Sequence, residues 1–203
     1  MMEKSYGIDL SKNKYRIFLK RSTDIIFSLI LILIFSPFLL LISIAIKLDS
    51  PGRVVFKQSR VGLNSKHFNM YKFRTMKEGT VDLPAEKLPE REKKVTRVGK
   101  FLRRFSIDET LQLINILKGD MSFVGPRPSH LGQKEQIKIR KEFKTDKIRP
   151  GLTGLAVVNG RDALSIKEKA EFDRIYVYHY KPFMDLVIIL KTFGIVLTFR
   201  GGN

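Results

Sequence analysis

IIFSLILILIFSPFLLLISIAI, residues 25–46, is a run of 22 residues without a charged side chain. At a rise of about 1.5 Å per residue, a straight helix of this length crosses a hydrocarbon core of roughly 30 Å. A cleaved signal peptide fits poorly, because the run begins late, is too long for the apolar part of such a signal and lacks a small-residue cleavage site. The run therefore predicts a helix embedded in a membrane.

The middle of this run carries Ser36-Pro37, and both of its flanks are basic. Proline removes a backbone hydrogen bond and costs about 3 kcal/mol or more inside a regular helix, while a serine hydroxyl can satisfy a freed carbonyl. The basic residues before the run are Lys12, Lys14, Arg16, Lys20 and Arg21, and those after it are Lys47, Arg53, Lys57 and Arg60. Because basic flanks favour the cytoplasmic side, two interpretations stay open: a kinked transmembrane helix, and a re-entrant helix that breaks at Ser36-Pro37 and returns.

The composition narrows the classes of partner. The 203 residues carry a formal net charge of +18 and include no cysteine, three histidines and no tryptophan. Such a basic surface attracts polyanions, namely nucleic acid, anionic lipid headgroups or phosphorylated substrates. Without cysteine and with three scattered histidines, the chain offers neither a disulfide framework nor the ligands of a structural zinc site.

The rest of the chain predicts a mainly α-helical fold with a small β-hairpin. Strands are expected at 54–58 and 66–73, and a charged loop at 77–94. Helices are expected at 98–105, 108–118, 130–143 and 163–178, the second of them ended by Gly119.

The apolar stretch 182–199 is interrupted by Asp185 and Lys191. An interfacial helix lying on the membrane, or a buried core helix, therefore fits this stretch better than a second membrane span.

The stretch RRFSIDETLQL, residues 103–113, places two acidic residues at a predicted helix start. Ser106 and Glu109 have the spacing of a capping box, in which each side chain accepts a hydrogen bond from the other residue's backbone. Acidic residues also suit the positive end of the helix dipole. Asp108 is not needed for such a cap, so a catalytic role for the acidic pair stays open beside the structural one.

Three arginines stand in rigid or glycine-rich turns: Arg127 between two prolines, Arg149 before Pro-Gly, and Arg161 after Asn-Gly. A rigid backbone and a guanidinium fork suit bidentate binding of phosphate. The sequence has no P-loop, no nucleophile elbow and no recognisable nucleic-acid-binding motif. Together with the membrane segment and the acidic pair, this favours phosphoryl chemistry at a membrane surface, in which a carboxylate binds a divalent cation or attacks phosphorus.

Six motifs in one order resemble the bacterial sugar transferases of the monotopic phosphoglycosyl transferase type. They are Lys20-Arg21-x-x-Asp24, Ser36-Pro37, YKFRTM at 71–76, SIDE at 106–109, KGDMSFVGPRP at 118–128 and RPGLTGLAVVNGR at 149–161. These motifs extend over nearly the whole chain, and KGDMSFVGPRP is highly specific. The chain departs from the common pattern at Thr110, Leu155 and Val157, which leaves the transferred sugar undetermined.

The resemblance implies a reaction in which a sugar-1-phosphate passes from a UDP-sugar to undecaprenyl (polyprenyl) phosphate, with release of UMP. It implies Asp108 as the nucleophile that carries a covalent phospho-sugar, and Glu109 as its acidic partner. It also implies Mg²⁺ as the cofactor, held near Asp108 and Glu109. The phosphate contacts that it implies are Lys72, Arg103, Arg127 and Arg161.

The resemblance also favours the re-entrant interpretation, with the structural break at Ser36 and Pro37. Residues 1–203 are then one catalytic unit: a re-entrant helix at 20–48, and a compact cytoplasmic catalytic domain with surface-lying amphipathic helices at 49–203. The expected location is the bacterial inner membrane, facing the cytoplasm, with anionic lipids but no nucleic acid as partners and a homodimer left open. The competing hypothesis is a membrane-anchored polyanion-binding protein without catalysis.

Overall fold

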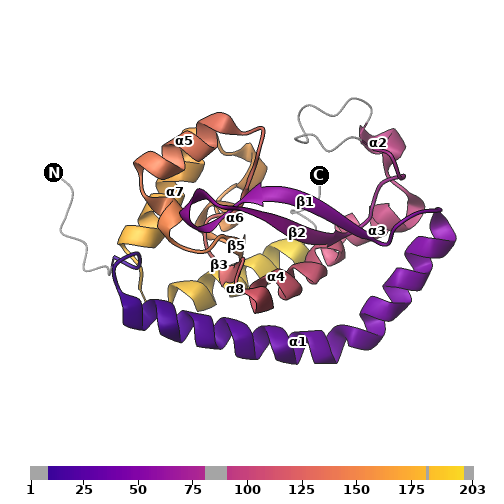
Figure 1. Ribbon diagram of the computed structural model, residues 1–203, viewed down its shortest axis with the longest axis horizontal. Helices are drawn as coiled ribbons and strands as arrows, with labels where there is room; N and C mark the ends of the chain where they lie inside the picture. Colours follow the sequence, from indigo (N-terminus) through magenta and orange to yellow (C-terminus); the bar gives the residue numbers. More distant parts are fainter. Residues whose placement is uncertain (1–8, 81–90, 182, 199–203) are drawn as a thin grey trace.

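The computed structural model describes residues 9–80, 91–181 and 183–198. Its longest element is α1 (Lys14–Asp49), a helix of 36 residues capped by Asn13, whose side chain accepts a hydrogen bond from the Arg16 amide. α1 runs along one side of the molecule and bends partway (Figure 1). Sharp bends in helices are usually caused by proline, and α1 contains Pro37. α1 is continuous through Ser36-Pro37, so the chain bends within one helix, and its re-entrant position in a membrane stays a prediction.

The predicted β-hairpin is present and gains a third strand. β1 (Val55–Val61) pairs antiparallel with β2 (His67–Phe73), and the short β4 (Ser129–His130) pairs with the end of β1 on its other side. The strands are joined through η1 (Leu63–Ser65), where Asn64 adopts a left-handed conformation with φ 52°. The first strand extends to Val61, three residues beyond its predicted end.

The free edge of β2 is closed by a side chain. Asn115 is fully buried, and its amide accepts a hydrogen bond from the Tyr71 N–H (2.9 Å) and donates one to the Asn69 carbonyl (2.7 Å). The amide thereby replaces the neighbouring strand that this edge would otherwise pair with. This contact fixes α4 (Gln112–Lys118), which carries Asn115, against β2.

The other predicted helices are present, mostly with shorter bounds. The remaining elements are α2 (Arg91–Lys94), α3 (Arg97–Arg104), η3 (Ile107–Leu111), β3 (Ser122–Val124), α5 (Lys134–Glu142), η4 (Thr145–Lys147), β5 (Gly151–Thr153), α6 (Leu155–Val158), η5 (Arg161–Ala163), α7 (Ile166–Tyr178) and α8 (Met184–Leu197). β3 and β5 form a separate parallel pair. Gly119, with φ 91°, ends α4 as predicted.

Two predictions of secondary structure need correction. The helix expected at 130–143 starts at Lys134, because Ser129–His130 joins the sheet. The charged stretch 77–94 ends in the short helix α2, and its residues 81–90 lie outside the described residues.

The capping box predicted at Ser106 and Glu109 is wrong. Ser106 has the left-handed conformation, with φ 54°, and its side chain makes no capping hydrogen bond. The Glu109 side chain instead pairs with Lys72 and Arg127. A capping box does form elsewhere, between Ser165 and Glu168 at the start of α7.

Three residues of the Lys20-Arg21-x-x-Asp24 motif attach the first part of α1 to the body of the protein. Lys20 forms an ion pair with Asp185 of α8 (2.6 Å), and Arg21 donates to the Ile116 and Leu117 carbonyls at the end of α4. Asp24 is buried and accepts a hydrogen bond from the Phe123 amide of β3 (3.1 Å). This motif therefore has a structural use, which is to dock α1.

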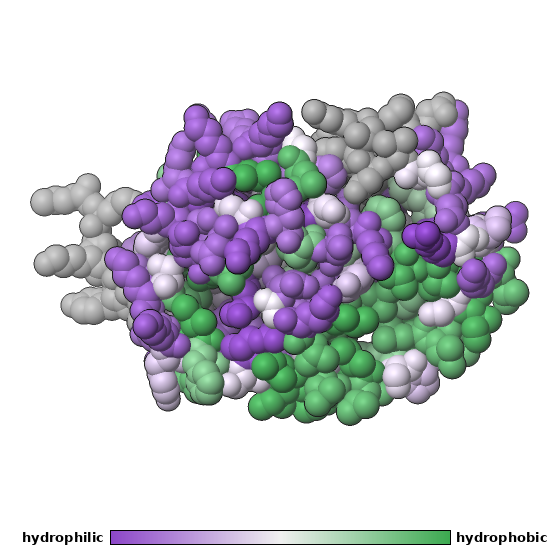
Figure 2. Space-filling model, in the orientation of Figure 1, coloured by the Kyte–Doolittle hydropathy of each residue, from purple (hydrophilic) through white to green (hydrophobic). Residues whose placement is uncertain are grey.

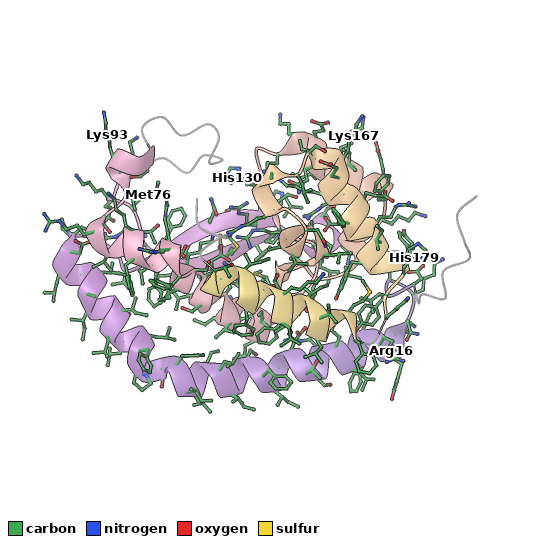
Figure 3. The ribbon with its side chains drawn as sticks, turned by 180° about the vertical axis from the view of Figure 1, so that it is seen from behind. Arg16, Met76, Lys93, His130, Lys167 and His179 are labelled. Carbon is green, nitrogen blue, oxygen red and sulfur yellow. The ribbon has the colours of Figure 1, made fainter. Side chains whose placement is uncertain are left out.

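The other end of α1 is attached to a different part of the body. Asp49 accepts a hydrogen bond from the Val98 amide of α3 (2.9 Å), and Arg74 donates to the carbonyls of Ser50 and Pro51. Figure 3 shows the distance covered: Arg16, at the start of α1, lies with His179 at one end of the molecule, and Met76 and Lys93 lie at the other end.

The outer side of α1 is apolar and exposed. Within the described residues, α1 is the one helix long and apolar enough, by length and composition, to cross a membrane, and little of its apolar stretch is buried. Apolar side chains gather along the lower edge of the molecule, where α1 runs, and hydrophilic ones dominate the part above it (Figure 2). α8 also exposes apolar side chains, namely Phe183 just before it and Leu186, Val187, Leu190 and Phe193 within it, although its Ile188 is buried in the core.

Candidate active site

Asp108 and Glu109 lie on η3, a single 3₁₀ segment between α3 and α4 that packs against β2. The left-handed Ser106 separates η3 from α3, so the chain turns before the acidic pair. Leu111, two residues after Glu109, packs with Phe73 and Leu102 in the core and holds η3 in place. Asp108 is 9% exposed as a result, which places its carboxyl group at the edge of the protein interior.

Glu109 is held by two cations from distant parts of the sequence. Lys72 of β2 contacts its Oε1 (Nζ–Oε1, 2.8 Å), and Arg127, from the loop between β3 and β4, contacts both carboxylate oxygens (Nη1–Oε2, 3.3 Å). These residues are 37 and 18 positions away from Glu109 in the sequence. Three of the six motifs, YKFRTM, SIDE and GPRP, therefore meet at one carboxylate.

The two acidic residues have opposite pKa shifts. Burial, and then the negative charge of Glu109, raise the pKa of Asp108 to about 6, although Lys72 and Arg103 act in the other direction. Burial alone would raise the pKa of Glu109 too, but the charges of Arg127 and Lys72 outweigh it and hold this pKa well below its usual range. Glu109 is thus ionised under all ordinary conditions, and Asp108 is the member of the pair that titrates near neutral pH.

Of the other predicted phosphate contacts, Arg103 lies close to the acidic pair. Arg103 donates to the Thr75 hydroxyl (2.8 Å), and its charge acts on the pKa of Asp108. Arg161 begins η5, with φ 47°, and its role as a phosphate contact stays a prediction.

Arg149, the third arginine in a rigid turn, has a structural use. Its Nε donates to the Gly119 carbonyl just after α4 (2.8 Å). An arginine near a helix C-terminus pairs well with its free carbonyl groups, so this side chain supports the end of α4.

Two contacts of the site were not anticipated from the sequence. Thr75 accepts the hydrogen bond from Arg103, and the Leu152 carbonyl of β5 accepts one from Arg127 (3.2 Å). Thr75 belongs to the YKFRTM motif, so its position in the motif is a signal that could have indicated it. The Leu152 contact runs through the backbone, and no side-chain pattern could have revealed it.

The donor set at the acidic pair suits a divalent ion that is shared with a substrate. Among the residues that the structure describes, no group of three or more His, Cys, Asp or Glu side chains comes together. Mg²⁺ does not require such a cage, because it is commonly held by one or two carboxylates together with substrate phosphates and water. Asp108 and Glu109 can supply that number of ligands.

The described geometry is accompanied by a family match. Residues 15–199 match the family described as bacterial sugar transferase. The chain belongs to this family. This is the family that the six sequence motifs resemble.

Two relatives of this sugar transferase are much longer than the chain itself. UDP-glucose:undecaprenyl-phosphate glucose-1-phosphate transferase of Escherichia coli (strain K12) is 40% identical over 181 residues, which cover 86% of this chain and 39% of that protein. UDP-N-acetylgalactosamine-undecaprenyl-phosphate N-acetylgalactosaminephosphotransferase of Aeromonas hydrophila is 40% identical over 191 residues, which cover 92% of this chain and 45% of that protein. The chain thus spans less than half the length of these two relatives.

A third relative is similar in length. Exopolysaccharide production protein PSS of Rhizobium leguminosarum bv. phaseoli is 40% identical over 185 residues, which cover 86% of this chain and 92% of that protein. The part of the longer relatives that matches this chain therefore also occurs in a protein of about this size.

Proposed function

We propose that this sugar transferase moves a sugar-1-phosphate from a UDP-sugar to undecaprenyl phosphate and releases UMP. The names of the Escherichia coli and Aeromonas hydrophila relatives describe this class of reaction. The observation that carries the proposal is the acidic pair itself, in which Glu109 is neutralised by Lys72 and Arg127 while Asp108 is not part of that ion pair. The site thus holds one fixed carboxylate and one reactive carboxylate.

The reaction proceeds in two displacements at the β-phosphorus of the UDP-sugar. In the first, an Asp108 carboxylate oxygen forms a bond to that phosphorus, and the bond from phosphorus to the bridging oxygen breaks, so UMP leaves with the electron pair. In the second, an oxygen of undecaprenyl phosphate attacks the same phosphorus. The bond to Asp108 then breaks, the carboxylate is regenerated, and undecaprenyl-diphosphate-sugar is formed.

The basic residues make this attack feasible, since a carboxylate must approach an anionic diphosphate. Arg103 lies near Asp108, and Arg127 and Lys72 offset the negative charge of Glu109. The net negative charge around the nucleophile is therefore smaller than that of two unpaired carboxylates, which lowers the repulsion of the diphosphate. A Mg²⁺ ion held by Asp108 and Glu109 together with the diphosphate would supply further charge neutralisation. With a pKa of about 6, Asp108 is roughly nine-tenths ionised at pH 7 and is ready to act as a nucleophile.

The attachment of α1 supports a re-entrant position in the cytoplasmic leaflet of the inner membrane. The first part of α1 is bound through Lys20 and Arg21, and its end through Asp49, all to the same body. A helix that crossed the bilayer would separate these two ends by the hydrocarbon core, whereas a bent helix with its exposed side in lipid keeps both ends at one surface. The apolar side of α8 lies against the same leaflet in this arrangement.

The membrane position is tested with single-cysteine variants, since the chain has no cysteine of its own. Lys12→Cys and Arg53→Cys place the thiols before and after α1. Both thiols should react with an impermeant thiol reagent only when the reagent has access to the cytoplasmic side of the membrane. Labelling of the two positions from opposite sides would refute the re-entrant arrangement.

The reaction is tested with purified protein, Mg²⁺, undecaprenyl phosphate and a panel of UDP-sugars, with UMP release as the readout. Wild type should release UMP with at least one sugar, Asp108→Asn should not, and Lys141→Gln on the exposed side of α5 should match wild type. Mass spectrometry of a reaction without lipid acceptor should find the phospho-sugar on Asp108. Full turnover by Asp108→Asn would exclude Asp108 as the nucleophile. Salt-dependent binding of anionic vesicles without UMP release for any sugar would instead favour a polyanion-binding protein.

A further inference from the structure

A buried ion pair outside the site joins α5 to α7. Arg140 donates from Nε (3.2 Å) and Nη2 (2.8 Å) to the Oδ2 atom of Asp173, and both residues are almost fully buried. Burial of two charges is costly, and buried ion pairs are often no more stabilising than apolar side chains of similar size. Stabilisation of the packing between α5 and α7 therefore does not by itself explain why a buried ion pair is present here.

The same guanidinium has a third contact, which leads toward the active site. Its Nη1 donates to the Ser129 hydroxyl (2.9 Å), and Ser129 is 1% exposed. Ser129 belongs to β4, where it lies opposite Val61 of β1. The labelled neighbour His130 shows this position in Figure 3, between the strands and the helices α5 and α7.

Ser129 is two residues after Arg127, and the backbone between them has little freedom. Prolines on both sides of Arg127 restrict the backbone of the loop. The Pro126 carbonyl accepts a hydrogen bond from the Gly151 amide (3.0 Å), so the loop is held on its first side by β5. At its other end, the loop is held at Ser129, whose hydroxyl accepts the hydrogen bond from Arg140. A shift of Ser129 is therefore expected to move the backbone of Arg127.

We propose that Arg140, Asp173 and Ser129 are positioning residues, which hold the Gly125–Pro128 loop so that Arg127 meets Glu109. Asp173 fixes the orientation of the Arg140 guanidinium, and the guanidinium in turn fixes the position of Ser129. This inference rests on the proposed function, because Arg127 then acts on the diphosphate substrate. Arg140→Lys keeps the charge but loses the planar fork that contacts Asp173 and Ser129 together.

The experiment is a double-mutant cycle in the UMP-release assay with the full-length protein. Ser129→Ala and Arg140→Lys should each lower kcat/KM about tenfold. Arg174→Lys is the matched control: Arg174 also pairs with an acid on α7, Glu171, but at the exposed surface, so its activity should equal that of wild type. In an Arg127→Ala background, Ser129→Ala should lower kcat/KM less than twofold further, since the residue it positions is gone.

A purely structural role predicts a different outcome. Ser129→Ala would then lower kcat/KM by the same factor with and without Arg127, and this result would overturn the proposal, as would full activity of Ser129→Ala.

Hydrogen exchange separates this inference from the proposed function. The Gly125 amide donates to the Thr153 carbonyl and the Gly151 amide to the Pro126 carbonyl, so both hydrogen bonds join the loop to β5. These two amides should exchange faster in Ser129→Ala than in wild type, and at the wild-type rate in Arg174→Lys. If wild type released no UMP, the proposed function would fail. Unchanged exchange at both glycines in Ser129→Ala would then still refute the positioning role.

Discussion

Replacement of Asp108 by asparagine should abolish activity and yet stabilise the folded protein at neutral pH. Burial and Glu109 raise the pKa of Asp108 to about 6 in the folded state, from an ordinary value of 3.8. The folded state therefore binds the proton more tightly than the unfolded state does. The contribution of Asp108 to stability is greatest below pH 3.8 and is lost as the pH rises through 6.

The size of this effect follows from the two pKa values. At pH 7.5 the shift of about two units corresponds to roughly 3 kcal/mol of destabilisation, and at pH 4 to roughly 0.5 kcal/mol. The asparagine amide must itself be buried, which takes back roughly 1–2 kcal/mol. We therefore expect Asp108→Asn to raise the free energy of unfolding by about 1–2 kcal/mol at pH 7.5 and to lose this advantage near pH 4.

The measurement is urea unfolding in mild detergent, followed by circular dichroism, with a chelator present so that no metal ion is bound to the acidic pair. The low-pH comparison is the internal control, because near pH 4 the same arithmetic makes the variant about 0.5–1.5 kcal/mol less stable than wild type. A variant that is less stable than wild type at pH 7.5, or a difference that does not change with pH, would refute the view that Asp108 is held as a destabilised carboxylate.

Three further changes test other parts of the structure. Arg127→Ala leaves Glu109 with Lys72 alone and should lower kcat/KM for UMP release by about 10²–10³, and a loss below threefold would remove Arg127 from the site. Gln112→Met should raise the free energy of unfolding by about 1 kcal/mol, because neither polar atom of this fully buried amide has a hydrogen-bond partner within the part of the chain that the structure describes; destabilisation would show that the amide is bonded in solution. Asn115→Leu leaves backbone groups of Asn69 and Tyr71 unpaired and should cost about 2–3 kcal/mol in urea unfolding, whereas a neutral effect would mean that water can replace the amide.

The sequence allowed prediction of the elements with local signals. The hairpin follows from two short strand-like segments around a glycine turn, and Gly119 ends α4 because only glycine readily adopts its positive φ. The capping box failed for a reason that is not local. Glu109 had the correct spacing from Ser106, but Lys72 and Arg127, which the fold brings beside it, offer a charged partner in place of a backbone amide.

The candidate site shows the same division. The motifs indicated Asp108, Glu109 and the basic residues as a set, but not which cation pairs with which acid. Arg127 and Arg149 looked alike in the sequence, each beside a proline in a rigid turn. One contacts Glu109 and the other supports the end of α4, a difference that depends on how β3 and β5 pair. Contacts through the backbone carbonyls of Gly119 and Leu152 leave no trace in side-chain patterns.

The bend in α1 connects the membrane helix to the geometry of the site. Before the bend, Leu31 and Ile32 pack with Leu113 and Ile116 of α4, and after it, Leu39 and Ile42 pack with the cluster that includes Leu111 of η3. Pro37 lies between these two contacts. The angle of the bend therefore affects how α4 and the cluster around Leu111 are supported, because the first half of α1 packs against α4 and the second half against that cluster. A helix that straightened could not keep both contacts, so the conformation that suits the proposed position in one leaflet is also the one that supports the acidic pair.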